Sequence, residues 1–125
     1  MVAARVGCLP VTDGRRRLIG IVTDRDVCVL VAWRHDPWDV PVSHIMAGDV
    51  VSCRASDHID VALVAMKENG LRRIPAVDAH MHVMGLVSVD DVILRTDTRR
   101  SVIPGEAVLD VLRHICEHEA PATPL

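Results

Sequence analysis

Phenylalanine and tyrosine are absent from this chain, and tryptophan occurs only at Trp33 and Trp38. Proteins that bind single-stranded nucleic acid stack its bases on aromatic side chains, so this composition does not favour such a function. Neither sign of charge is in large excess: 14 basic residues stand against 17 acidic ones, which gives a net charge of −3. Without a basic surface the chain lacks the electrostatic signature of a nucleic-acid partner, and we expect none.

Long apolar runs are also lacking. The longest covers residues 27–33, whereas a helix needs about 20 apolar residues to cross a bilayer. The start of the sequence has no basic segment followed by an apolar one, as a secretory signal peptide would have. We therefore expect no membrane partner and a cytoplasmic location.

Cysteine is sparse: the four residues stand at positions 8, 28, 53 and 116, with no C-x-x-C pair. Three lie in apolar stretches, where a free thiol behaves as a small buried hydrophobe. Metal sites usually show closely spaced pairs of ligands. The spacing therefore predicts buried, inert thiols rather than disulfides or metal ligands.

Histidine occurs in two close pairs. His80 and His82 flank Met81 in an expected turn, and His114 and His118 are four positions apart on an expected helix. Each pair offers only two ligands, and a structural zinc site needs about four. We expect exposed polar side chains at these positions and no metal site.

The usual signs of catalysis are missing as well. The sequence has no P-loop, no G-x-G-x-x-G after an apolar strand, and no recognisable pairing of a nucleophile with a base. We therefore expect a protein that is not an enzyme and that carries no cofactor.

What the sequence does contain is a repeated motif. Residues 20–26 read GIVTDRD and residues 85–91 read GLVSVDD, 65 positions later. Each copy ends an apolar run in a hydroxyl residue, Thr23 or Ser88, and a carboxylate follows three positions on. The pattern predicts a strand that turns into a helix with the hydroxyl at the helix start. Free N–H groups there suit an anion such as phosphate, and the carboxylate can accept hydrogen bonds from sugar hydroxyls.

The repeat extends upstream without a gap. At the same offset Pro10 matches Pro75 and Asp13 matches Asp78. Each copy reads as a strand (8–12 and 74–77), a turn near the aspartate, a second strand (18–22 and 83–87) and a helix. Such agreement at one fixed offset indicates an internal repeat rather than chance.

This pattern resembles the CBS domain, named after cystathionine beta-synthase, which occurs as tandem pairs called Bateman modules. The resemblance is carried by residues 71–78 (LRRIPAVD), 83–88 (VMGLVS) and Asp91, with residues 6–26 as the second copy. It implies an α/β (α+β) fold of tandem repeats, each a small sheet packed with helices, related as a pseudo-two-fold pair. The closest likeness is to small stand-alone bacterial proteins. The implied segments are a partial first repeat (1–34), a linker (35–45), a second repeat (46–98), and a C-terminal helix and tail (99–125).

The first repeat is expected to be truncated at its N-terminus. The second repeat is preceded by an expected strand near 50–53 and a helix over about 57–69, capped by Ser56 or Asp57 and stopped at Asn69 and Gly70. The first repeat has no counterpart of these elements. Either the sequence starts at an internal methionine or the protein is naturally short. An uncovered apolar face favours self-association, so we expect a homodimer.

Three further helices are expected. Residues 27–33 continue the first repeat as a buried helix that ends near Arg34, and residues 42–46 form a short helix. Pro104 marks the start of an amphipathic helix that ends near residue 119. Its apolar stripe consists of Val108, Leu112 and Ile115.

The resemblance also implies a ligand. In such modules the aspartate of the motif holds a ribose, the hydroxyl residue and nearby cations face the phosphates, and adenine lies against apolar strand residues, here around 51–53 and 74–76. The nucleotide-binding residues implied for this chain are Thr23, Asp26, Arg72, Arg73, Ser88 and Asp91. Gly7 and Cys8 stand in place of the two arginines in the first repeat, so the second site is the better equipped.

We therefore expect a non-catalytic regulatory module that binds AMP, ATP or a related adenosyl compound in the cleft between its repeats. A ligand would act by its different affinity for two arrangements of the module, and the change would pass to an effector protein or an oligomer. Two other hypotheses stay open. In one, the chain is a dimerisation or interaction module whose clefts stay empty. In the other, it is a metal-responsive protein whose histidine pairs bind a metal.

Overall fold

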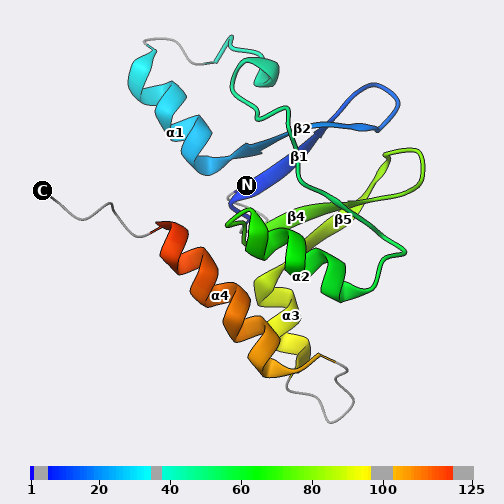
Figure 1. The fold of residues 1–125 in the computed structure, drawn as a ribbon. Coiled ribbons are helices and arrows are strands. Elements are labelled where there is room, and N and C mark those ends of the chain that lie inside the picture. Colours follow the sequence, from blue (N-terminus) through cyan, green and yellow to red (C-terminus); the bar gives the residue numbers. More distant parts are fainter. Residues whose placement is uncertain (2–5, 35–37, 97–102, 120–125) are drawn as a thin grey trace, which may run out of the picture. The chain divides into compact units, whose positions relative to one another are not determined.

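The computed structural model describes residue 1 and residues 6–34, 38–96 and 103–119. These residues form helices and small sheets, so the predicted α+β class is confirmed (Figure 1). The chain divides into two compact units. Unit 1 comprises Met1–Val50 and Ala79–Val83, and unit 2 comprises Val51–Asp78 and Met84–Leu125.

The sheet of unit 1 has two antiparallel strands, β1 (Cys8–Thr12) and β2 (Leu18–Thr23). Both agree with the predicted strands to within one residue. Their register pairs Cys8 with Thr23 and Val11 with Gly20. Strand β2 thus ends at the hydroxyl residue of the first motif, and the next helix begins directly after it.

Asp13 holds the turn between these two strands. Its carboxylate accepts hydrogen bonds from the main-chain N–H groups of Arg15 and Arg17, at 2.8 and 3.0 Å, and pairs with the Arg17 guanidinium at 2.8 Å. The main-chain hydrogen bond from Arg17 is the largest cause that lowers the pKa of Asp13 below its ordinary value. Aspartate suits such a turn because its short side chain reaches the backbone a few residues on.

Helix α1 (Asp24–Trp33) follows β2 directly, and Arg34 is its C-cap, as predicted. The prediction that this helix is buried is wrong, because in the described part of the chain none of its side chains is buried. The apolar pattern indicates a helix that needs covering, but other elements decide whether it is covered. Within residues 6–34 and 38–50 of unit 1, the described helices and strands are β1, β2, α1 and the short 3-10 helix η1 (Val42–His44). Helix η1 is shorter than the predicted 42–46.

The segment after η1 lies beside β2. Ile21 and Ala47 exchange both main-chain hydrogen bonds, at 3.0 and 2.9 Å. Met46 packs directly over Gly20, where a Cβ would lie 2.9 Å from the Met46 Cγ and 3.1 Å from the carbonyl oxygen of Ala47. Because only glycine lacks a Cβ, this close approach requires glycine at position 20.

Unit 2 contains a three-stranded sheet in the order β3-β4-β5. The strands are β3 (Cys53–Arg54), β4 (Arg73–Val77) and β5 (Val83–Ser88). The helices are α2 (Ile59–Glu68), α3 (Val89–Thr96) and α4 (Gly105–Glu119). β3 runs parallel to β4, and α2 makes the connection between them. Within the described ranges, no helix is long and apolar enough to span a membrane.

The core of unit 2 lies where α2, α3 and α4 pack with the sheet (Figure 1). Its most deeply buried side chains include Met66, Ile74 and Ile115. Truncating one such side chain to alanine typically costs about 2–5 kcal/mol. At the surface, the Lys67 ammonium on α2 pairs with the Asp110 carboxylate on α4 at 2.5 Å, and this hydrogen bond lowers the pKa of Asp110. The predicted amphipathic helix is thus confirmed, and its apolar face completes this core.

The two ends of α2 compare differently with the prediction. Ser56 and Asp57 were expected as N-caps, but the N-cap is His58, which makes no capping hydrogen bond through its side chain. The Asp57 carboxylate instead accepts the main-chain N–H of Arg54 at 2.8 Å and closes the turn after β3. At the other end Asn69 is the C-cap, as predicted, and the glycine after it has a φ of 62°, which glycine adopts without steric cost.

All four cysteines are free thiols. Cys8 and Cys53 are buried, as predicted, and burial raises the pKa of the Cys53 thiol. Cys28 and Cys116 are exposed, so two thiols are buried where three were predicted to be. Both lie on helices, α1 and α4, where an apolar neighbourhood in sequence does not ensure that a given face is covered.

Candidate functional site

The second motif forms a closed hydrogen-bonded pair at the start of α3. Ser88 is the last residue of β5 and is buried. Its hydroxyl donates to Oδ2 of Asp91 at 2.5 Å, and the main-chain N–H of Asp91 donates back to the Ser88 Oγ at 3.0 Å. This arrangement caps the helix, and it also fixes the direction of the Asp91 carboxylate, whose side chain lies on the exposed surface.

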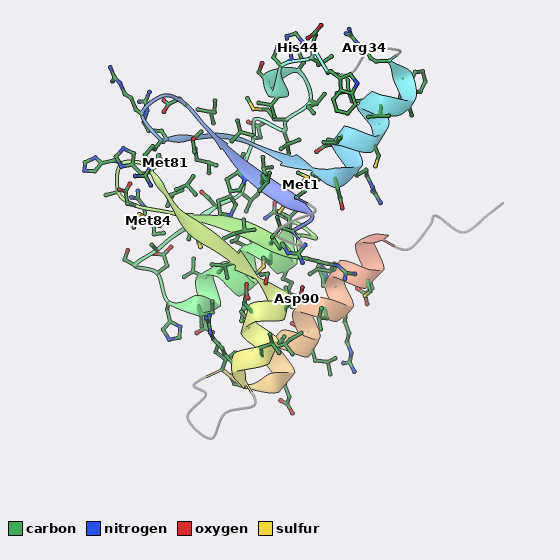
Figure 2. All side chains as sticks on the ribbon, turned by 180° about the vertical axis from the view of Figure 1, so that it is seen from behind. Met1, Arg34, His44, Met81, Met84 and Asp90 are labelled. Atoms are coloured by element: carbon green, nitrogen blue, oxygen red, sulfur yellow. The ribbon has the colours of Figure 1, made fainter. Side chains whose placement is uncertain are left out.

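Two arginines lie near the same helix start, Arg73 as the first residue of β4 and Arg72 directly before it. The carbonyl of Arg72 accepts the main-chain N–H of Val89 at 2.9 Å. The Arg73 guanidinium pairs with Oδ2 of Asp90 at 3.1 Å. Figure 2 shows Asp90 at the beginning of α3. The side chains of Ser88, Asp91 and Arg73 and the main chain of Arg72 therefore meet at one helix end.

The ion pair at this helix end can exchange its partners at small cost. The side chains of Arg73 and Asp90 are 35% and 67% exposed, and an exposed ion pair contributes only about 0–1 kcal/mol. Arg73 has five N–H donors, of which this pair uses one. A phosphate could therefore take up the remaining donors at small cost. Since Val89 and Asp91 already use their N–H groups within the protein, positive charge at this end comes from the arginines more than from the helix backbone.

Two hollows lie beside the motif in unit 2. The first has a volume of about 270 Å³ and lies between the end of β3, the start of α2 and β5. Its lining includes Cys53, Arg54, Asp57, His58, Ala76 and Met84. Two positions predicted to contact adenine, Cys53 and Ala76, are thus among its walls.

The second hollow has a volume of about 290 Å³ and adjoins the first. Ile59, Leu86 and Val87 line both. Asp91 and Arg95 are its charged wall residues. An apolar wall with one or two placed polar groups is typical of small-molecule sites, and these volumes are near the lower end of the usual range of about 300–1,000 Å³.

The first motif has the same frame in unit 1. Thr23 and Asp26 form a capping box, in which the Thr23 hydroxyl donates to Oδ2 of Asp26 at 2.7 Å and the N–H of Asp26 donates to the Thr23 Oγ1 at 3.2 Å. The N–H of Asp24 donates to the carbonyl of Gly7 at 2.9 Å. This bond is the counterpart of the bond from Val89 to Arg72, 65 positions later. Gly7 thus occupies the place of Arg72 and brings no charge.

Sequence reasoning missed several polar residues around the site. Asp90, which holds Arg73, lies 17 positions from it in sequence, and only the alignment of β4 with α3 brings them together. Arg54, Asp57 and His58 line the first hollow. The only sequence signal for them is their place between an expected strand and an expected helix, which predicts a helix cap at Ser56 or Asp57 but no binding site.

The histidine pairs do not form a metal centre in the described residues, where no group of three or more His, Cys, Asp or Glu side chains could hold a metal ion. The rings of His80 and His82 lie 5.9 Å apart between centroids and are tilted by 49°. Nδ1 of His114 lies 3.8 Å from the Glu117 carboxylate. The side chain of His118 lies outside the described residues.

Comparison with solved structures finds CBS domain pairs. The pair of the protein MJ0100, in complex with 5′-methylthioadenosine and S-adenosyl-L-methionine, is 22% identical with a TM-score of 0.64, over 74% of this chain and 72% of that one. CBSX2 in complex with AMP is 26% identical with a TM-score of 0.64, over 74% of this chain and 72% of that one. Both share the fold described above.

Curated relatives are longer proteins. The homoserine O-acetyltransferase of Methanococcus vannielii is 26% identical over 92 residues, which is 74% of this chain and 19% of that protein. The chain spans about half or less of the length of the curated relatives that it first matches. The shared part is therefore a module and not the whole of those proteins.

The family model of the CBS domain matches residues 1–32 and 42–96. These two ranges contain the two copies of the 65-residue repeat, each with its strand, its capping motif and the helix that follows. They cover more than half of the chain. The chain belongs to the CBS domain family.

Proposed function

We propose that this chain is a non-catalytic regulatory CBS module whose second repeat binds an adenine nucleotide or a related adenosyl ligand. The observation that carries the proposal is that Ser88, Asp91, the Arg73 side chain and the Arg72 main chain meet at the start of α3, beside two adjoining hollows. Each of these groups has a chemical counterpart in such a ligand. That two neighbours were solved with AMP or with adenosyl compounds supports the same ligand class.

Asp91 is the residue proposed to hold the ribose. The Ser88 hydroxyl contacts Asp91 at Oδ2 and at the main-chain N–H. Among the described residues, Oδ1 of Asp91 accepts no hydrogen bond. A carboxylate oxygen can accept hydrogen bonds from the two neighbouring ribose hydroxyls. Because the Ser88 hydroxyl already fixes the carboxylate, binding needs little further ordering of this side chain.

Arg72 and Arg73 are proposed to neutralise the phosphate. Guanidinium forks match the geometry of phosphate oxygens, and such charge-assisted bonds are among the stronger ones in proteins. Arg73 would keep or exchange its exposed pair with Asp90. In the first repeat Gly7 and Cys8 stand at these positions, so we expect that Thr23 and Asp26 bind a phosphorylated ligand much more weakly.

The adenine ring is proposed to lie against Ile59, Leu86 and Val87, the three apolar residues that line both hollows. A flat base buries both of its faces well against branched aliphatic side chains. An effect on a partner then requires that the ligand bind one arrangement of the module more tightly than another. The partner itself is proposed to be an effector protein.

The test is a calorimetric titration and thermal-shift panel of AMP, ADP, ATP, S-adenosylmethionine and zinc with the purified chain. A ligand that binds only the folded state stabilises it and so raises the melting temperature. At a ligand concentration of 100 times the Kd, the stabilisation is about 2.7 kcal/mol. Asp91→Asn keeps a side-chain acceptor for Ser88 but removes the charge, and we expect an affinity at least tenfold lower. Asp26→Asn is the matched control in the first repeat and should change the affinity little.

Two results would overturn this proposal. One is a chain whose melting temperature responds to none of the nucleotides while its far-ultraviolet circular dichroism remains that of a folded α+β protein. The other is a nucleotide affinity that Asp91→Asn leaves unchanged. A response to zinc alone would favour the metal-responsive hypothesis instead.

One observation favours the second candidate, an interaction module with empty clefts. The exposed side chains of α1 give the molecule an apolar helix on its surface, and such surfaces commonly mark binding sites for proteins. The two functions separate cleanly, because Asp91→Asn should weaken ligand binding and leave any association through α1 unchanged.

A further inference from the structure

Residues 15–17 form the only run of three like charges in the sequence, and all three are arginine. They lie between β1 and β2, and their side chains are exposed. The chain as a whole carries a net charge of −3. Three successive guanidinium groups are therefore a local departure from the charge of the whole molecule, and their surroundings show what they could bind.

A second turn lies beside this one in unit 1. It comprises residues 79–83 and connects β4 with β5; Figure 2 shows Met81 in it. Arg17 and His82 face each other in an antiparallel bridge, and main-chain hydrogen bonds of 2.8 and 3.3 Å join the two segments. The two turns, residues 13–17 and 79–83, thus form one surface, the paired-turn surface.

Two arginines of this surface keep their guanidinium groups available. The Asp13 carboxylate accepts the main-chain N–H groups of Arg15 and Arg17 and pairs with the Arg17 guanidinium. It therefore holds the turn and fixes one arginine. Among the described residues, the guanidinium groups of Arg15 and Arg16 take part in no ion pair. An arginine stays charged at any ordinary pH, so two positive groups remain for a partner.

Arg16 also holds an unfavourable backbone conformation. Its φ is 64°, and the equivalent residue of the second turn, Met81, has a φ of 67°. Glycine adopts this conformation without steric cost. Residues other than glycine that keep such a conformation cluster at functional sites. At Arg16 the side chain that is kept is an exposed guanidinium, so strain and charge coincide at one residue.

The surroundings of these arginines favour a protein as the partner. No residue of the two turns lines either hollow of unit 2, whereas small-molecule sites are concave. Sites for single-stranded nucleic acid add aromatic side chains to the cations, and neither tryptophan lies in these turns. Recognition of anionic lipids uses clusters of about four to eight basic residues, more than the three arginines of this surface. Acidic protein segments are recognised by arginine clusters, whose guanidinium forks match carboxylates.

We infer that the paired-turn surface binds an acidic segment of a partner protein, and that Arg15 and Arg16 pair with the carboxylates of that segment. The inference is independent of the nucleotide site, because none of the residues proposed to bind the nucleotide lies in these two turns. Ion pairs on an exposed surface are screened by salt, so this binding should weaken as the ionic strength rises.

The first test measures the binding of a fluorescein-labelled oligoglutamate peptide to the purified chain by fluorescence anisotropy at low salt. The double variant Arg15→Gln, Arg16→Gln should weaken binding by about tenfold or more, because it removes both charged donors. The double variant Arg25→Gln, Arg34→Gln is the matched control, since it removes the same charge from exposed positions of α1 and its C-cap. It should leave the Kd within about twofold of the parent chain. A labelled oligoglutamine peptide should not bind.

The second test separates binding from folding. Arg16→Gly relieves the backbone and removes the guanidinium. This variant should therefore be at least as stable as the parent chain in urea unfolding and yet bind the peptide more weakly. Met81→Gly relieves the equivalent backbone without removing a charge, so it should leave the Kd of the peptide within about twofold. Circular dichroism confirms for each variant that the fold is kept.

Three outcomes would overturn the inference. The peptide could fail to bind the parent chain up to millimolar concentration at low salt. The two double variants could lose affinity equally, which would indicate an effect of net charge alone. Finally, phosphatidylserine vesicles or a DNA duplex could bind more tightly than the peptide and lose that binding in Arg15→Gln, Arg16→Gln, which would assign the surface to a membrane or to nucleic acid instead.

Discussion

Arg17 and His82 face each other in an antiparallel bridge, and they are equivalent residues of the repeat, 65 positions apart. Beside them the N–H of Leu18 donates to the carbonyl of Met81 at 2.8 Å, and the N–H of Val83 donates to the carbonyl of Arg16 at 3.3 Å. Replacing each residue by its repeat equivalent turns one of these bonds into the other. Within unit 1 the two turns are thus joined as a two-fold related pair.

The backbone of the two turns is equivalent as well. Arg16 and Met81 are the only residues other than glycine with a positive φ in the described ranges, at 64° and 67°. A side chain in this conformation costs about 1–2 kcal/mol, and glycine avoids that cost while losing about 0.5–1 kcal/mol in chain entropy. Met81→Gly and Arg16→Gly should therefore each stabilise the chain slightly, by about 0.5 kcal/mol, in urea unfolding. Arg15→Gly and His80→Gly are the neighbouring controls, and stabilisation by these as well would contradict the explanation.

Gly20 and Gly85 are equivalent in the repeat but differ in their surroundings. Gly20 lies under Met46 and Ala47, whereas a Cβ at Gly85 would meet nothing within 4 Å. Gly20→Ala should destabilise the chain by about 1–2 kcal/mol, since it overpacks a close contact. Gly85→Ala should stay within about 0.5 kcal/mol of the parent. Thermal unfolding of both variants checks this, and equal effects would argue against close packing at Gly20.

The four thiols should differ in reactivity. Cys28 and Cys116 are exposed, whereas Cys8 and Cys53 are buried and the pKa of the Cys53 thiol is raised. Because the thiolate is the reactive form, a thiol reagent at pH 8 should modify two cysteines quickly and the other two only after unfolding. A chain with Cys28→Ser and Cys116→Ser should be unreactive until denaturant is added. Fast modification of that variant would show that the buried positions open readily.

Asp13 should contribute stability that depends on pH. Its pKa in the folded chain is below the ordinary value of 3.8, chiefly because of the main-chain hydrogen bond from Arg17. The contribution is therefore present above that ordinary value and is lost as the pH falls through the lowered pKa. The difference in melting temperature between the parent and Asp13→Asn should shrink between pH 5 and pH 2.

A second variant separates the causes of this shift. Arg17→Met keeps the main-chain N–H and removes the guanidinium, so the carboxyl of Asp13 should still titrate below its ordinary pKa in an NMR titration. A return of that pKa to its ordinary value would assign the effect to the side chain of Arg17 instead.

The strands and the helix starts could be predicted because their signals are local. In both repeats the hydroxyl residue and the aspartate three positions on bond to each other, at 2.7 Å for Thr23 with Asp26 and at 2.5 Å for Ser88 with Asp91. Such a pair needs nothing beyond four successive residues. The fixed offset of the repeat then extended each local interpretation to the second copy.

The errors concern features that distant elements decide. The apolar run of α1 predicts a helix but not its neighbours, and the helix is exposed. Asp57 was a reasonable cap by composition, but its carboxylate is taken by the main chain of Arg54. The pair between Arg73 and Asp90 depends on how β4 meets α3. Each case is set by packing between segments, for which a single sequence holds no direct signal.

The hydrogen bonds that cap the two helices also limit what the motif can tell us about ligands. Thr23 with Asp26 and Ser88 with Asp91 are needed to start α1 and α3, whether or not a ligand is bound. A repeat that stops binding its ligand would therefore keep its hydroxyl and its aspartate, because losing them would weaken the fold. The residues at positions 7 and 8, and at 72 and 73, do not cap a helix. Substitutions there should therefore reflect whether each repeat has kept its ligand.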